Sequence, residues 1–138
     1  MAAILGVDYG RKRIGIAVSD ESGSMALPRA TIEVTDSREA LEAVKRLCGE
    51  TGAGRIVVGL PLNMDGSKGP MAAEVEQFVA ALGRHVEVPV DLWDERFTSL
   101  IAERAMLEAD LSRRKRKGLR DKMAAQVMLQ GYLDGQRA

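Results

Sequence analysis

The stretch that decides the fold is ILGVDYGRKRIGIAVSD, residues 4–20. Residues 4–7 form a short apolar run that ends at Asp8, and residues 13–19 alternate branched with small side chains, as a strand does. The link between these two segments is short enough for a hairpin. We therefore expect two antiparallel strands, with Asp8 at the end of the first.

The next part of the chain is expected to add two strands and a helix. Residues 27–34 are typical of a third strand, and Asp36 with Glu39 has the spacing of a capping box, which begins a helix over residues 37–50. Residues 55–60 form a continuous apolar run, which is typical of a strand buried on both faces of a sheet.

The second half of the chain alternates helices with one more strand. Pro70 begins a second helix, residues 86–93 alternate as a fifth strand, and Thr98 or Ser99 caps a third helix. The apolar face of a last helix is formed by Ala124, Val127, Met128 and Gly131. Antiparallel strands followed by helix-linked strands predict an α/β fold with a mixed sheet flanked by helices, in a single domain over residues 1–138.

The composition is that of an ordinary globular chain without net charge. Its 138 residues include 20 basic and 20 acidic ones. A neutral sum argues against a nucleic-acid partner, because polyanion binders usually carry a positive balance. However, residues 113–122 hold seven basic residues and one acid, a local charge of +6, so the rest of the chain carries −6. We expect a polyanion to bind at that basic stretch.

Cysteine usage and hydropathy exclude several classes of protein. Cys48 is the single cysteine and His85 the single histidine, so neither a disulfide within the chain nor a Cys/His zinc cluster is available. The N-terminus lacks the basic segment of a signal peptide, and no apolar run reaches the ~18 residues of a membrane span. We expect a cytoplasmic protein with no membrane partner.

Three carboxylates lie where strand and helix ends place functional groups. Asp8 ends the first strand, Glu95 follows the fifth, and Asp121 lies in the first turn of the last helix. Carboxylates gathered in one cleft repel each other, so a hard cation such as Mg²⁺ or Mn²⁺ stabilises the cluster. Two such ions activate water and stabilise the leaving oxygen in phosphodiester hydrolysis. Taken singly, the acids also fit a turn residue, a solvated strand end and a helix-dipole partner.

Phosphate-binding groups follow the first two acids. Arg11, Lys12 and Arg13 share the tight turn after the first strand, where they can meet phosphates. Arg96 and Thr98 set a charged donor and a hydroxyl at a helix N-terminus, which also suits phosphate.

Two further segments are candidates for nucleic-acid contact. Asn63, Ser67 and Lys68 lie in the loop after the fourth strand and fit a simple turn as well as contacts to phosphates or sugar hydroxyls. The basic stretch fits a solvated face, but as a loop directly before Asp121 it would bring cations to the substrate. Its candidate contacts are Arg113, Arg114, Lys115 and Lys117.

Four motifs in order resemble the YqgF/RuvX family, a bacterial group with the ribonuclease H-like fold. They span residues 6–20, 56–67, 94–99 and 121–134. The resemblance implies a Mg²⁺- or Mn²⁺-dependent nuclease of ribosome biogenesis that matures the 5′ end of pre-16S rRNA, or alternatively a Holliday junction resolvase acting on branched DNA. It also implies that Asp8, Glu95 and Asp121 form the acidic active site.

Several alternatives stay open at this point. A non-catalytic RNA-binding module would keep the fold without the activity, whereas a phosphotransferase of the actin and sugar-kinase type needs a second domain that this chain is too short to supply. Related resolvases carry a fourth acid near the last one, which residues 122–133 lack; Asp94 or Asp20 are the candidates to assist. The expected partners are nucleic acid and a ribosomal precursor particle, bound by a monomer or homodimer.

Overall fold

The computed structural model describes the backbone of residues 2–95 and 113–137 and the side chains of residues 2–95 and 123–136. The strands are β1 (Ile4–Asp8), β2 (Arg13–Ser19), β3 (Ala26–Glu33), β4 (Arg55–Leu60) and β5 (Val90–Asp94). The helices are α1 (Ser37–Thr51), α2 (Pro70–Gly83) and α4 (Arg113–Arg137). No helix in the described ranges is long and apolar enough to cross a membrane.

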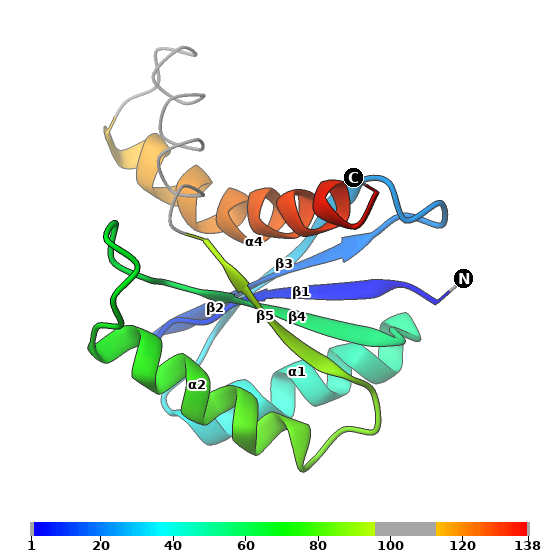
Figure 1. The fold of residues 1–138 in the computed structure, drawn as a ribbon, viewed down its shortest axis with the longest axis horizontal. Helices are drawn as coiled ribbons and strands as arrows, with labels where there is room; N and C mark the ends of the chain where they lie inside the picture. Colours follow the sequence, from blue (N-terminus) through cyan, green and yellow to red (C-terminus); the bar gives the residue numbers. More distant parts are fainter. Residues whose placement is uncertain (1, 96–112, 138) are drawn as a thin grey trace.

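The strands form one mixed sheet in the order β3-β2-β1-β4-β5. β1 pairs antiparallel with β2 and β2 with β3, whereas β4 runs parallel to both β1 and β5. Figure 1 shows α1 and α2 on one face of this sheet and α4 across the other. The predicted α/β architecture, with three antiparallel strands followed by helix-linked parallel strands, is confirmed.

Alternation along β1 divides the core into two layers. Leu5 and Val7 are fully buried in the cluster that α1 and α2 cover. Gly6 faces α4 instead: a Cβ at this position would lie 2.9 Å from the Cβ of Leu129. The helix therefore rests almost directly on the backbone of β1, and Asp8, two residues further, lies on the same face.

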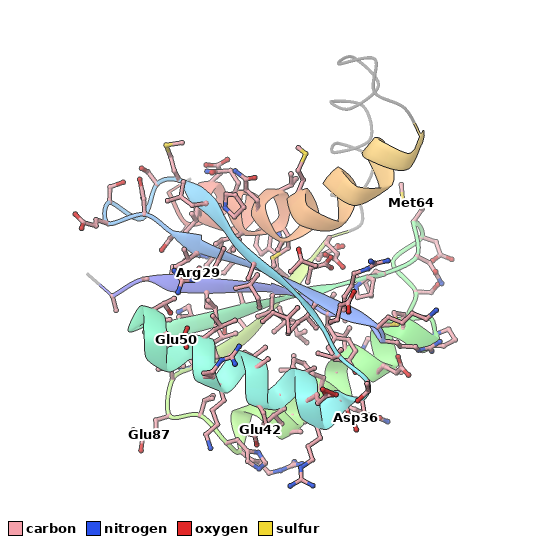
Figure 2. All side chains as sticks on the ribbon, turned by 180° about the vertical axis from the view of Figure 1, so that it is seen from behind. Arg29, Asp36, Glu42, Glu50, Met64 and Glu87 are labelled. Carbon is pink, nitrogen blue, oxygen red and sulfur yellow. The ribbon has the colours of Figure 1, made fainter. Side chains whose placement is uncertain are left out.

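The cap predicted for the first helix is present at Asp36, but Glu39 bonds to Thr35 rather than to the Asp36 N–H of a full capping box. The Asp36 carboxylate accepts a hydrogen bond from the Glu39 N–H at 2.8 Å, and the Glu39 carboxylate accepts one from the Thr35 N–H at 3.0 Å. Gly52 ends the helix in the left-handed conformation, with φ 66°. An ion pair of 3.7 Å between Arg29 of β3 and Glu50 of α1, both labelled in Figure 2, joins this helix to the sheet edge.

The predicted fifth strand over residues 86–93 starts too early. β5 begins only at Val90, because the Val86 N–H remains bonded to Leu82 at the end of α2 (3.1 Å) and Pro89 has no N–H to offer a ladder. The alternating valines belong to a connection whose apolar side chains still pack on the core.

The predicted start of the last helix is also wrong. α4 begins at Arg113, so Asp121 lies about two turns into the helix rather than in its first turn. The basic stretch 113–122 is consequently helical, not the loop that we expected, since Arg and Lys are good helix formers. The helix expected to begin at Thr98 or Ser99 lies outside the described residues.

Candidate active site

Two of the three predicted acids meet at one edge of the sheet. β1, β4 and β5 are parallel, so their carboxyl ends share an edge. Asp8 ends β1, and Glu95 follows β5 directly, with its N–H bonded to the Leu60 carbonyl at 3.2 Å. That bond extends the pairing of β4 with β5 by one residue, so the backbone of Glu95 is fixed by the sheet.

The alternation of β5 places Glu95 on the α4 face. Asp91 accepts a hydrogen bond from the Tyr132 hydroxyl of α4 at 3.3 Å, and the ring of Trp93 stands edge-on to the Tyr132 ring at 5.5 Å. Glu95 continues this series of every second residue, on the same face as Asp8. Asp94 falls on the opposite face and is exposed, so alternation separates it from the pair.

A glycine lies next to each of the two acids. Gly15 pairs directly with Asp8 across β1 and β2. Gly59 of β4 lies under Glu95: a Cβ at this position would overlap the Glu95 carboxylate, 2.7 Å from its Cδ, and would lie 3.2 Å from Cγ of Met128. Any side chain at residue 59 would therefore displace the acid.

The electrostatics of Glu95 favour its protonated form. Burial raises its pKa from 4.5 to about 8, and the negative charges of Asp8 and Asp94 contribute further. A cation beside the pair would reverse this preference, because it stabilises the charged carboxylates. The donor set consists of carboxylate oxygens, which are the ligands of hard cations such as Mg²⁺ and Mn²⁺.

The third predicted ligand comes from the covering helix. Residue 121 lies four and seven positions before Ala125 and Met128, both fully buried against the sheet, and so on the same helix face. Since Met128 packs at Gly59, residue 121 is about 10 Å further along α4 toward the carboxyl edge. Among the residues with described side chains, no three acidic, Cys or His groups gather as a metal site, so Asp121 would have to complete it.

The family model RuvX, described as Holliday junction resolvase, matches residues 2–135. The chain belongs to the RuvX family. Two curated relatives carry the name "Putative pre-16S rRNA nuclease": one from Syntrophomonas wolfei is 49% identical over 96% of this chain and 94% of its own length, and one from Halothermothrix orenii is 46% identical over 96% and 95%.

Solved structures show the same fold at low sequence identity. Thermus thermophilus RuvC in complex with a Holliday junction substrate is 14% identical, with a TM-score of 0.58 over 100% of this chain and 97% of that one. The fowlpox virus resolvase, solved with Holliday junction DNA, is 13% identical, with a TM-score of 0.55 over 99% of both chains. The ribonuclease H-like fold expected for this RuvX-family protein is therefore confirmed.

The basic turn after β1 borders the acids. Asp8, Arg11, Lys12 and Arg13 line one hollow of about 470 Å³. The Arg11 guanidinium forms an ion pair of 2.8 Å with Glu74 of α2, which raises its pKa and holds the side chain against the helix. The structure thus brings the three predicted cations of this RuvX-family protein together beside Asp8.

The other predicted contact residues divide into two groups. Asn63, Ser67 and Lys68 lie in the loop at the same edge; the Asn63 amide donates to the Ser67 hydroxyl at 2.9 Å, and Lys68 pairs with Glu76 at 3.0 Å. The remaining candidates lie outside the described side chains: Arg96, Thr98, Arg113, Arg114, Lys115 and Lys117.

Two glutamines that sequence reasoning missed hold α4 to the sheet, at the end opposite the acids. Gln130 accepts from the Ala26 N–H at 2.9 Å and donates to the Ser24 carbonyl at 2.9 Å, while Gln126 donates to the Ala26 carbonyl at 3.1 Å. Both polar groups of the Ala26 backbone, at the start of the edge strand β3, are thereby satisfied by α4. Gly59 was also missed, although a glycine inside a run of branched residues is a signal of close backbone approach.

Proposed function

We propose that this RuvX-family protein is a metal-dependent nuclease that hydrolyses a phosphodiester bond during 5′-end maturation of pre-16S rRNA. The proposal is based on the Asp8–Glu95 pair, which lies on the α4 face of the sheet next to Gly15 and Gly59. The names of the relatives support the substrate, and the resolvase-like fold supports phosphodiester chemistry.

Asp8, Glu95 and Asp121 would hold the cations, two Mg²⁺ or Mn²⁺ ions in this proposal. Bound ions supply charge for the scissile phosphate and a polarised water. Glu95 would bind a cation in its charged form; Gly59 leaves room for that carboxylate, and Gly15 adds no side chain beside Asp8. The basic side chains of the β1–β2 turn, Arg11, Lys12 and Arg13, would orient the phosphates next to the scissile one.

Asp8→Asn tests this assignment. The amide keeps the shape of the side chain but removes the charge, so we expect Mg²⁺- or Mn²⁺-dependent cleavage of a pre-16S rRNA fragment to fall by roughly 100-fold or more. Asp94→Asn is the matched control: the residue precedes Glu95 but lies on the opposite face of β5, and activity should stay within about threefold. Unchanged cleavage by Asp8→Asn would show that the site lies elsewhere.

Junction resolution is the second candidate, favoured by the description of the family and by the fold shared with two resolvases. A four-way DNA junction offered beside the rRNA fragment separates the two substrates. Symmetric cuts in the junction require two active sites and so a homodimer, whereas trimming an RNA end requires only one. We propose that the protein acts on a ribosomal precursor particle in the cytoplasm, as a monomer or a homodimer.

A non-catalytic RNA-binding module is distinguished by the unmutated protein alone. It would bind the rRNA fragment and leave it intact at every concentration of Mn²⁺ or Mg²⁺. Cleavage that EDTA abolishes and Mn²⁺ restores excludes this function.

A further inference from the structure

The loop between β4 and α2, residues 61–69, leaves the sheet between the two acids. β4 is the strand that separates β1 from β5, so the loop begins between Asp8 and Glu95. Both views show it projecting beyond the carboxyl edge, at the end where α4 begins (Figures 1 and 2). A nucleic-acid strand that reaches the acids from this end meets the loop.

Hydrogen bonds within the loop hold its shape. The Asn63 N–H donates to the Ser67 carbonyl at 2.9 Å, and the Gly66 N–H donates to the Asn63 carbonyl at 2.8 Å. The Asp65 carboxylate accepts from both the N–H and the hydroxyl of Ser67, at 2.8 and 2.6 Å. Gly66 adopts φ 88°, which favours glycine. The loop is thus a preformed projection that loses little entropy when it meets a ligand.

Met64 occupies the tip of this projection. Its side chain is 62% exposed, more than any other large hydrophobic side chain in the described part of the chain. Figure 2 labels it where it extends outward from the loop. A thioether has no hydrogen-bond donor for a phosphate, but its flexible apolar surface fits the face of a base. Apolar side chains such as Met insert between bases in nucleic-acid complexes.

We propose that Met64 is a wedge that packs against a nucleobase next to the scissile phosphate. The inference rests on the proposed nuclease function and names its substrate class: a strand whose bases are unstacked beside the cut, such as a single-stranded end or a branch point. Insertion costs least where the strand is already unpaired, so a continuous duplex is a poor substrate.

The test uses the full chain carrying Asp8→Asn, so that the strand stays intact. A short single-stranded RNA carries 2-aminopurine, a base analogue whose fluorescence rises on unstacking, at successive positions. In Mg²⁺ we expect a rise at one or two adjacent positions. Adding Met64→Ala should abolish the rise and weaken binding roughly tenfold, because one base contact is lost. The same strand in a continuous duplex should show no rise.

Three matched variants control for folding and for exposure. Met64→Leu keeps an apolar tip and should retain the fluorescence rise, whereas Met64→Gln is similar in length but polar and should lose it. Met25→Ala removes a methionine that is 57% exposed in the β2–β3 loop, at the opposite end of the sheet, and should change neither readout. Equal melting temperatures of all variants show that they are folded.

Two results would overturn the wedge. One is no local rise in 2-aminopurine fluorescence when residue 64 is Met; the other is a fluorescence rise and an RNA affinity that Met64→Ala changes by less than about twofold. Neither readout depends on cleavage. A Met64-dependent rise without metal-dependent cutting by the natural chain contradicts the nuclease and supports the wedge. Cutting that Met64→Ala leaves equally fast and equally selective for unpaired strands contradicts only the wedge.

Discussion

Glu95 is held where its charged form is least stable. Its pKa rises from 4.5 to about 8, through burial first and then through Asp8 and Asp94. The unfolded chain releases this proton near pH 4.5 and the folded chain near pH 8, so between these values the folded state binds more protons. The contribution of Glu95 to the free energy of unfolding therefore decreases as the pH rises through this window.

Glu95→Gln should separate stability from activity. Without divalent cations, the variant should exceed the natural protein in free energy of unfolding by roughly 2–4 kcal/mol at pH 8 and differ little near pH 4.5, because the amide carries no charge at either pH. Cleavage should be lost, because the amide is a poor ligand for a hard cation. Urea unfolding in EDTA at both pH values measures the first effect; equal stability at pH 8 would contradict it.

Gly59→Ala tests the close approach of β4 to Glu95. The added Cβ overlaps the carboxylate, so we expect the acid to shift and cleavage to fall roughly 10- to 100-fold at a given Mn²⁺ concentration. Gly49→Ala in α1 is the control, because a Cβ there meets nothing within 4 Å. Since alanine favours helix over glycine, this variant should be more stable by roughly 0.5–1 kcal/mol. Natural activity in Gly59→Ala would mean that Glu95 tolerates displacement.

Among the elements, α4 depends on polar contacts as well as on packing. Gln130→Ala removes the bonds to Ala26 and Ser24, and we expect a loss of roughly 1–2 kcal/mol in the free energy of unfolding together with a lower kcat, since the helix also carries Asp121. Gln77→Ala removes an exposed glutamine of α2 and should change neither quantity by much. A stability loss with unchanged kcat would assign Gln130 a purely structural role.

Local chemistry predicted most elements correctly. Residues 13–19 and 55–60 have the expected strand bounds, because alternation and a doubly buried apolar run reflect how each strand meets its neighbours. The cap at Asp36 also needs only nearby residues.

The failures concern features that tertiary contacts decide. Residues 86–89 alternate like a strand, yet Pro89 has no N–H for a ladder and β5 starts after it. The glutamine contacts of α4 join residues 100 or more positions apart, and a glutamine on a helix carries no sign of a distant backbone partner. The gathering of Asp8 with Glu95 was predictable because parallel strands end at one edge. By contrast, the sequence did not show on which face of the sheet Asp94 lies, because this depends on the register of β5.

For the whole molecule, zero net charge results from an uneven distribution. The predicted binding face contains the β1–β2 turn and the first turns of α4, where residues 113–122 carry +6. Some cations near the acids are already neutralised, since Arg11 pairs with Glu74 and Lys68 with Glu76. The basic turns of α4 should therefore dominate long-range attraction of a polyanion.

Replacing Arg113, Arg114 and Lys115 by Ala tests this distribution. Alanine favours helix, so α4 should persist while affinity for RNA falls at low salt and the slope of log K against log salt becomes shallower by roughly 2. The control replaces three basic residues of α1, on the other face of the sheet: Arg38, Lys45 and Arg46. Equal salt slopes for the two triple variants would contradict a binding face at α4.

The two layers of the core differ in size, which affects how the proposed site is assembled. Beneath the sheet, α1 and α2 share a large buried cluster, whereas α4 rests on a smaller one with bare glycine at Gly6. The upper layer should open by local unfolding at a lower free energy than the whole domain, with faster amide exchange in α4 than in β1. If Asp121 completes the proposed site, each opening would separate it from Asp8 and Glu95. Substrate and cations that bind all three acids would then close α4, so that catalytic assembly and the last step of folding are one equilibrium.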